Sequence, residues 1–315
     1  MSRGVILVGE PMGLFIAQSE GELCDVSGYD AAVAGAEFNV AVGLARLEKR
    51  VTYLTRLGKD PFGQKIVRSL QHNGIGTEFI SFSNDKVTGF MLKSRVSKGD
   101  PEIFYFRKDS AASTLSKEDV DCIDFSNYGF LHLTGILPAL SEITRETAFY
   151  LIQKARENGL TVSFDPNLRP QLWPDKETMI SVINELAFRS DYVLPGEAEG
   201  EILCNTRNLN EIGRFYLEHG VKAVIVKKGS HGAYTITKSE QELVPGVQVK
   251  NVVDTVGAGD GFAAGFLSGL MEGKSLYEAV RRGNAVGAIQ VTNPGDNEGL
   301  PSRKELADFM GLSML

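Results

Sequence analysis

The residues with the clearest chemical potential form one short stretch, Asp-Thr-Val-Gly-Ala-Gly-Asp, at positions 254–260. Residues 257–259 stand where a helix is expected to begin, so their backbone amides would converge at the positive end of that helix. Small residues let a phosphate group approach such amides closely. The carboxylate of Asp260 would repel a resting phosphate, but it could take a proton from an attacking hydroxyl. This stretch indicates phosphoryl transfer; the alternative is a helix N-terminus capped by Asp254 or Asp260, with glycines used only for packing.

The helix expected after this turn contains regularly spaced glycines. Gly261, Gly265 and Gly269 recur four residues apart, and each costs about 1 kcal/mol relative to alanine inside a helix. We predict that this stripe lets a neighbouring element pack at short range and so holds the helix against a sheet. The segment before the turn, residues 249–255, is predicted to be a strand.

Elsewhere, short apolar runs alternate with segments of helical period. The apolar runs, predicted to be strands, cover residues 4–9, 51–58, 129–135, 160–165, 191–196 and 222–229. The amphipathic segments, predicted to be helices, include residues 36–48, 61–73, 142–158 and 208–219. This alternation predicts an α/β fold with a mainly parallel central sheet covered by helices on both faces.

Two segments interrupt the alternation. Residues 88–107 are typical of two strands joined by a turn at 97–101, and residues 14–33 lack a helical period. We predict that segments of about 12–34 and 87–109 form a small β-sheet lid over the strand ends. With no long linker or repeat between these parts, residues 1–315 are predicted to be a single domain.

Composition and charge exclude several classes of protein. The chain has 315 residues, a net charge of −7 and a pI near 5.3, which argue against affinity for nucleic acid or an anionic membrane. No apolar run approaches a membrane span, and the N-terminal run is too short for a signal peptide. Three scattered cysteines, Cys24, Cys122 and Cys204, are interpreted as buried free thiols of a cytoplasmic protein.

With these motifs in view, the sequence resembles the ribokinase-type (PfkB) family of sugar kinases. Residues 254–260 match the family's D-T-x-G-A-G-D motif, and the stretch AGAEFNVA at 34–41 matches a second motif with Ala34 in place of a glycine. The resemblance implies the three-layer ribokinase-like fold, ATP as donor and Asp260 as catalytic base. It also implies that the amides of Gly257, Ala258 and Gly259 hold the transferring phosphoryl group.

The resemblance implies a nucleotide and metal site as well. It assigns Gly229, Ser230 and Gly232 to the phosphates or ribose and Asn284 to the adenine, although residues 226–234 taken alone favour a simple hairpin turn. Family members hold Mg²⁺ through an N-x-x-E element, which here retains only Glu199, because Gly196 replaces the asparagine. A monovalent cation such as K⁺ is implied near Asp254.

Three further stretches resemble those of the 2-keto-3-deoxygluconate kinases within this family. They are residues 104–113, 164–174 and 87–92, and they carry Tyr105, Arg107, Arg169 and Phe90. Tyr105 and Arg107 are two apart on a predicted strand and share a face, whereas Phe104 and Phe106 share the other. Arg169 follows a strand at its carboxyl end, where ligands of open α/β sheets bind, and its guanidinium matches a carboxylate.

These residues predict that the acceptor is a small sugar acid. The N-terminal motif adds Gly35 and Asn39, which would touch sugar hydroxyls, while Glu10 could do likewise or be a solvated strand-end carboxylate. For Arg169 the alternative is a surface pair with Asp175, and for Tyr105 and Arg107 it is exposure on a lid edge.

Other functions stay open at this point. Fructokinase and 5-keto-2-deoxygluconate kinase share the motifs, and a non-catalytic sugar-binding protein could keep the fold. Exposed lid strands such as 101–107 favour pairing between subunits in a homo-oligomer.

Overall fold

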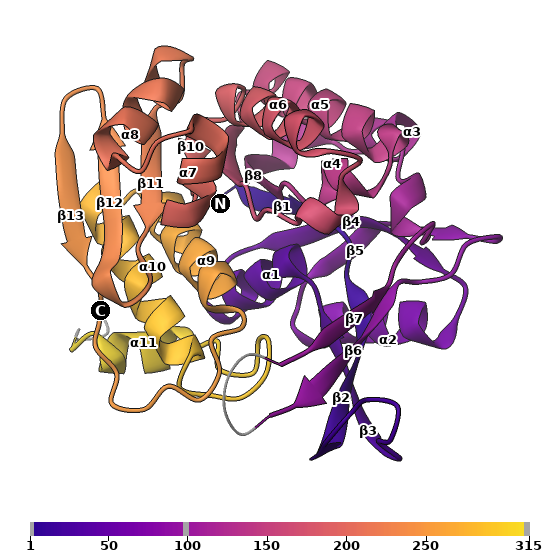
Figure 1. The fold of residues 1–315 in the computed structure, drawn as a ribbon. Coiled ribbons are helices and arrows are strands. Elements are labelled where there is room, and N and C mark those ends of the chain that lie inside the picture. Colours follow the sequence, from indigo (N-terminus) through magenta and orange to yellow (C-terminus); the bar gives the residue numbers. More distant parts are fainter. Residues whose placement is uncertain (1–2, 97–100, 312–315) are drawn as a thin grey trace.

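A large sheet of nine strands forms the centre of the molecule (Figure 1). The computed structural model describes residues 3–96 and 101–311. The strands of the large sheet are β1 (Gly4–Val8), β4 (Val51–Gly58), β5 (Gly76–Ser83), β8 (Tyr128–Thr134), β9 (Thr161–Asp165), β10 (Tyr192–Val193), β11 (Ala223–Lys227), β12 (Gly232–Thr237) and β13 (Gln241–Pro245). They follow the order β13-β12-β11-β10-β9-β8-β1-β4-β5, and all neighbours from β11 to β5 are parallel. Only β12 and β13 join antiparallel, which confirms the predicted, mainly parallel sheet.

Helices cover both faces of this sheet. On one face pack α3 (Lys117–Asp121), α4 (Leu137–Leu140), α5 (Glu142–Glu157), α6 (Lys176–Phe188), α7 (Glu197–Cys204) and α8 (Leu209–Glu218). On the other pack α1 (Ala36–Arg46), α2 (Pro61–His72), α9 (Ala258–Met271), α10 (Leu276–Gln290) and α11 (Arg303–Phe309). Strand β1 shows why both faces need a cover, because successive side chains alternate across a strand and those of β1 are apolar on both faces. Ile6 and Val8 belong to the core on the first face, and Val5 and Leu7 belong to the core on the second face. The three-layer fold is therefore confirmed.

A small second sheet projects from one side of the main body (Figure 1). Its strands are β2 (Met12–Glu20), β3 (Tyr29–Ala34), β6 (Phe90–Arg95) and β7 (Ile103–Phe106), in the order β3-β2-β6-β7. The predicted pairing within 88–107 is confirmed, because β6 and β7 are antiparallel with Phe90 opposite Phe106. Most of the predicted turn at 97–101 lies outside the described residues.

The glycine stripe of α9 packs against α10 rather than against the sheet. A Cβ atom added at Gly265 would lie 2.7 Å from the carbonyl oxygen of Arg282, and one at Gly269 would lie 2.7 Å from the Cα of Ala279. The two helix backbones thus approach more closely than any side chain would allow. The prediction of close packing is confirmed, but the element named as its partner was wrong.

Two other predictions were wrong. Residues 249–255 form no strand: β13 ends at Pro245, and Val252 and Val253 are about 60 % exposed in a loop where the amide of Val253 donates to the carbonyl of Val291 rather than to a strand. The thiols are free, but Cys24, in a loop, and Cys122, at the end of α3, are exposed, and Cys204, at the end of α7, is only half-buried against the core. Over residues 3–96 and 101–311, no helix combines the length and apolar character that a membrane crossing requires.

Candidate active site

A cavity of about 410 Å³ lies between the small sheet and the beginning of α9. It contains most of the residues that the sequence assigned to the acceptor and to catalysis. Its lining includes Gly35, Asn39, Tyr105, Arg107, Arg169, Glu199, Gly257, Gly259 and Asp260. Segments far apart in the sequence therefore meet around one cavity, as the motifs predicted.

Asp260 lies in the first turn of α9, and its carboxylate is held by a side chain from the opposite end of the chain. Asn39 Nδ2 donates a hydrogen bond to Asp260 Oδ2 at 2.8 Å, and Asn39 Oδ1 accepts one from Asn297 Nδ2 at 2.9 Å. Burial raises the pKa of Asp260 from 3.8 to about 7, with the nearby charge of Asp165 also raising it and the Asn39 amide lowering it. A carboxylate with a pKa near neutrality is suited to act as a general base.

The turn before Asp260 presents unpaired amides to the cavity. Gly257 has φ 76°, and a Cβ atom there would lie 2.1 Å from the carbonyl oxygen of Asp296, so only glycine fits. Within the described residues, the amides of Gly257, Gly259 and Asp260 have no acceptor, as is expected at a helix N-terminus. Ala258 donates a long bond of 3.4 Å to the carbonyl of Thr255. The turn can therefore bind an anion, as its sequence predicted.

Gly35 sets the entry to α1 and so the position of Asn39. It has φ 143°, and a Cβ atom there would lie 2.9 Å from the carbonyl oxygen of Glu10. The glycine lets β3 turn sharply into the helix beside the end of β1. Asn39 lines the cavity and donates a hydrogen bond from Nδ2 to Asp260, which orients that carboxylate, and its expected contact with sugar hydroxyls stays a prediction.

Arg107 enters the cavity already paired with an acid. Its Nε donates to Glu10 Oε2 at 2.7 Å, and Ser110 donates its hydroxyl to Glu10 Oε1. Both Arg107 and Glu10 are buried, so Glu10 is neither the solvated carboxylate nor a free sugar ligand that the sequence suggested. Tyr105 lines the cavity next to Arg107, whose guanidinium carbon is 5.7 Å from the tyrosine ring centre.

Phe90 was assigned to the acceptor, but the structure places it outside this cavity. Its ring stacks on Phe106 at 4.7 Å and on Phe62 at 5.8 Å, on the opposite face of β6 from Met91, which lines the cavity. Residues adjacent on a strand point to opposite faces, which is why the Phe90 side chain lies away from this cavity. Phe104 and Phe106, which share the strand face opposite Tyr105 and Arg107, are about half exposed in this single chain.

Arg169 is the cavity's less constrained arginine. Its Nη1 donates to the carbonyl of Leu168 at 2.9 Å, and none of the ion pairs among the described residues includes it. The suggested pair with Asp175 is wrong, because Asp175 caps α6 by accepting from the amide and hydroxyl of Thr178. Arg169 can therefore offer hydrogen bonds to an anionic group in the cavity.

A second cavity of about 420 Å³ lies on the other side of the turn. It is lined by Gly229, Ser230, Gly232 and Asn284, as predicted for the nucleotide, together with apolar residues such as Val247 and Val291. Asn284 differs in detail: its Nδ2 donates to the carbonyls of Val244 and Pro245 at 3.1 Å each, so its donors are directed to backbone. The apolar walls suit the flat face of a base.

The two cavities meet at Lys227, a residue that the sequence analysis missed. Lys227, Thr255 and Gly259 line both of them, and Lys227 Nζ lies 2.5 Å from Asp165 Oδ2. Both residues stand at the carboxyl ends of strands, β11 and β9, where α/β sheets place their ligands. That rule, applied to every polar strand end, could have found them.

The predicted metal positions differ in how free they are. Glu199 lines the first cavity, but its two oxygens accept from the amides of Leu168 at 2.8 Å and Gly196 at 2.6 Å. The carboxylate keeps further lone pairs for a metal-bound water, so a role in holding Mg²⁺ stays a prediction. Asp254, expected beside a monovalent cation, is paired with the ammonium of Lys93 at 3.1 Å.

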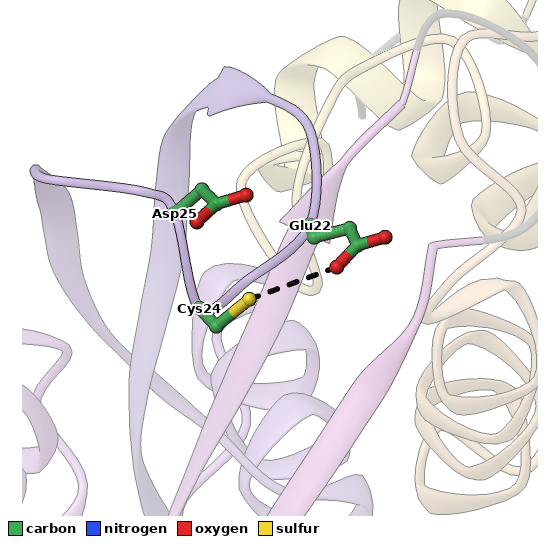
Figure 2. Close-up of side chains that lie close together, drawn as sticks. All are labelled: Glu22, Cys24 and Asp25. Atoms are coloured by element: carbon green, nitrogen blue, oxygen red, sulfur yellow. Dashed lines mark hydrogen bonds between the residues drawn. The ribbon is translucent and has the colours of Figure 1, made fainter.

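One cluster of side chains with metal-binding donors lies outside this region. Figure 2 shows Glu22, Cys24 and Asp25 in the exposed turn between β2 and β3, with Cys24 Sγ 3.7 Å from Glu22 Oε2. All three side chains of the cluster are exposed. It was not predicted, and it is remote from the Asp260 cavity.

The chain and its fold belong to a kinase family. A model of the pfkB family of carbohydrate kinases matches residues 2–303, so the chain belongs to that family. The chain is 44 % identical over 311 residues to a 2-dehydro-3-deoxygluconokinase of Bacillus subtilis (strain 168), covering 98 % of this chain and 96 % of the relative.

Two solved structures are similar in fold and were crystallised with ligands. A putative ribokinase II from E. coli in complex with ATP and Mg²⁺ has a TM-score of 0.88 and 26 % identity, covering 98 % of this chain and 99 % of that one. A fructokinase double mutant from Vibrio cholerae O395, bound to fructose, ADP and potassium, has a TM-score of 0.87 and 26 % identity, covering 98 % of each chain.

Proposed function

We propose that this carbohydrate kinase transfers the γ-phosphoryl group of ATP to 2-keto-3-deoxygluconate, which is 2-dehydro-3-deoxygluconate by its other name. The product is 2-keto-3-deoxy-6-phosphogluconate. The observation that carries the proposal is the junction of two cavities at Gly259 and Lys227, with the carboxylate of Asp260 beside it. The identity of 44 % to a 2-dehydro-3-deoxygluconokinase supports the choice of acceptor.

In this proposal Asp260 acts as the base. Its carboxylate takes the proton of the acceptor's 6-hydroxyl while that oxygen forms a bond to the γ-phosphorus, and the bond from that phosphorus to the bridging oxygen of ADP breaks. Asn39 positions the Asp260 carboxylate by binding its Oδ2 atom, which leaves Oδ1 of Asp260 to accept the proton. A general base contributes about 10²- to 10⁴-fold to such a reaction.

The anion charge would be stabilised by groups that do not move during the step. The amides of Gly257 and Gly259, two residues that line the first cavity, have no acceptor within the described residues, and each preorganised donor of this kind contributes about 3 kcal/mol. We assign Lys227 to the same task. Burial alone would lower the pKa of Lys227, but the charges of Asp165 and Glu199 outweigh burial and raise that pKa above its ordinary value, so the ammonium stays charged. Mg²⁺, held by Glu199 through water, would neutralise charge on the donor phosphates.

The acceptor's carboxylate would bind at Arg169. The ion pair of Arg107 and Glu10 carries almost no net charge. Arg169 lines the same cavity and has no acid partner within the described residues. Tyr105 completes the wall and can donate its hydroxyl to the sugar. An arginine without an acid partner is suited to a carboxylate, which it can hold with two hydrogen bonds.

A panel of acceptors tests the proposal. ADP formation is followed with 2-keto-3-deoxygluconate, fructose, 5-keto-2-deoxygluconate and gluconate, with Asp260→Asn as the inactive control. We expect the highest kcat/KM with 2-keto-3-deoxygluconate. Faster turnover of a neutral sugar would reject the acceptor, and ADP formation independent of Asp260 would reject the mechanism.

Fructokinase is the second candidate, and one observation favours it. Glu10 neutralises most of the charge of Arg107, the one member of this pair that lines the cavity, so a neutral ketose could accept a hydrogen bond from Arg107. The structural relative from Vibrio cholerae binds fructose. A 5-keto-2-deoxygluconate kinase and a non-catalytic sugar-binding protein are distinguished in the same panel, the latter by binding without turnover.

We further propose that the chain is one domain whose lid, residues 12–34 and 87–109, pairs with a second copy. On the face of the small sheet away from the cavity, the rings of Phe90 and Phe106 stack on each other, Phe62 of α2 stacks on Phe90, and Phe106 is about half exposed. Sedimentation of the wild type and of Phe106→Ser tests this: we expect a dimer that the substitution weakens.

We also propose that the protein is cytoplasmic, because an ATP-dependent activity and free thiols both fit that compartment.

A further inference from the structure

A buried lysine of the small sheet occupies the position where a monovalent cation was expected. Lys93 on β6 is 5 % exposed, and its Nζ lies 3.1 Å from Asp254 Oδ2 and 3.0 Å from Asp296 Oδ1. Asp254 precedes the catalytic turn, and Asp296 lies in the loop before α11. One ammonium thus bridges two loops that are far apart in the sequence.

Both aspartates contact the turn that carries the phosphate-binding amides, Asp254 through its carboxylate and Asp296 through its backbone carbonyl. Asp254 Oδ1 accepts from the amide of Val256 at 3.0 Å, and the carbonyl of Asp296 lies against Gly257, where even a Cβ atom would clash. Gln290 donates to the carbonyls of Val256 at 3.4 Å and Gly295 at 2.8 Å. The two loops therefore hold the turn between them, and Lys93 joins the loops.

The charge on Lys93 is retained in this position. Its ammonium is paired with two carboxylates at once, and the side chains of Lys93 and Asp296 are both nearly excluded from solvent. A free monovalent ion placed at the same carboxylates would be repelled by this ammonium and would have to compete for the same oxygens. These residues therefore do not fit a free potassium ion while Lys93 is present.

We propose that the Lys93 ammonium takes the place of a free monovalent cation between Asp254 and Asp296, so that catalysis by this chain requires no potassium. Lys93 is a positioning residue: it fixes the two loops and through them the amides of the turn. The effect on turnover rests on the proposed kinase function, whereas the effect of ions on the folded protein does not.

The wild type and Lys93→Met are compared in KCl and in choline chloride of equal ionic strength, with all other monovalent metals absent. For the wild type we expect kcat to differ by less than about twofold between the two salts. For Lys93→Met we expect kcat to fall by about tenfold or more in choline chloride and to recover in part in KCl, with a smaller change in KM. Lys86→Met, at an exposed lysine between β5 and β6, is the matched control and should behave as the wild type in both salts.

A second measurement needs no turnover. The melting temperature of Lys93→Met should rise in KCl relative to choline chloride, whereas that of the wild type should not, because only the variant has two unpaired carboxylates for the ion. Strong activation of the wild type by potassium would overturn the proposal. A folded Lys93→Met protein that gains neither stability nor activity from potassium would also overturn it. If Lys93→Met does not fold, the activity of the wild type in KCl and in choline chloride tests the proposal by itself. If no acceptor is phosphorylated, the melting temperatures in the two salts still test it.

Discussion

Replacement of Asp260 by asparagine should have opposite effects on activity and on stability. The substitution keeps the shape of the side chain and its contact with Asn39, since an asparagine oxygen can accept the same hydrogen bond. It removes a negative charge that burial makes unfavourable. Turnover should fall by at least about 10²-fold because the general base is lost.

The gain in stability follows from the pKa of Asp260. Burial raises that pKa from 3.8 to about 7, so between these values the folded protein binds a proton that the unfolded chain has released. The folded state therefore loses stability as the pH rises through this range, by about 1.4 kcal/mol per unit of pKa difference and about 4 kcal/mol in total above pH 7. Asparagine does not ionise, so the variant avoids this loss.

Urea unfolding at pH 5 and pH 8 measures the difference. Trp173 is the chain's single tryptophan and is buried, so its fluorescence reports on folding. The stability advantage of Asp260→Asn over the wild type should be about 3 kcal/mol larger at pH 8 than at pH 5. Asp85→Asn, at an exposed carboxylate, serves as the control and should show almost no change.

Two results would refute this reasoning. An advantage that does not grow with pH would mean that the Asp260 carboxyl is not held at a high pKa in the folded protein. Unchanged turnover would mean that this carboxylate is not the base. Loss of turnover without the stability gain would separate the two claims, since only the pKa argument would then fail.

Three other predictions follow from the site. The kcat/KM of the wild type should rise about tenfold per pH unit below pH 7 and level off above it, because the Asp260 carboxylate must be free of its proton; a profile that is flat from pH 5 to 8 would contradict this. Arg169→Ala should raise KM for a sugar acid about tenfold or more while changing KM for a neutral sugar little, as measured in the acceptor panel, and equal effects on both would remove the carboxylate assignment. Gly257→Ala should abolish turnover because the added carbon meets the Asp296 carbonyl at 2.1 Å, whereas Gly259→Ala, whose nearest neighbour is 3.8 Å away, should fold normally; thermal melting and ADP formation test both.

Much of the fold could be predicted because its causes are local. The apolar run at 51–58 is strand β4 (Val51–Gly58), and the amphipathic segment at 142–158 is helix α5 (Glu142–Glu157). Alternation of such runs leaves a parallel sheet between two helical layers as the stable arrangement. Residues 249–255 were misjudged because an apolar run becomes a strand only where another strand edge is free to pair with it.

The site was predictable to the extent that its chemistry is contained in one contiguous motif. The Asp260 turn needs small residues and a helix start, and both are visible in the sequence. Side-chain partners across the fold were not visible: Glu10 pairs with Arg107, and Asn297 with Asn39, over separations that no local pattern encodes. Phe90 was wrongly assigned to the acceptor because the pairing register of β6 with β7, which the sequence does not reveal, decides which of its side chains face the cavity.

The sequence by itself thus determined the layered fold, the helix-terminal anion site and the carboxylate beside it, since these depend on periodicity and on residues adjacent in the chain. Only the tertiary structure decided that the Lys93 ammonium lies between Asp254 and Asp296, and that Lys227 joins the two cavities. The physical reason is that the energy of a buried charge depends on which opposite charges surround it in space, and folding brings those together from distant parts of the chain.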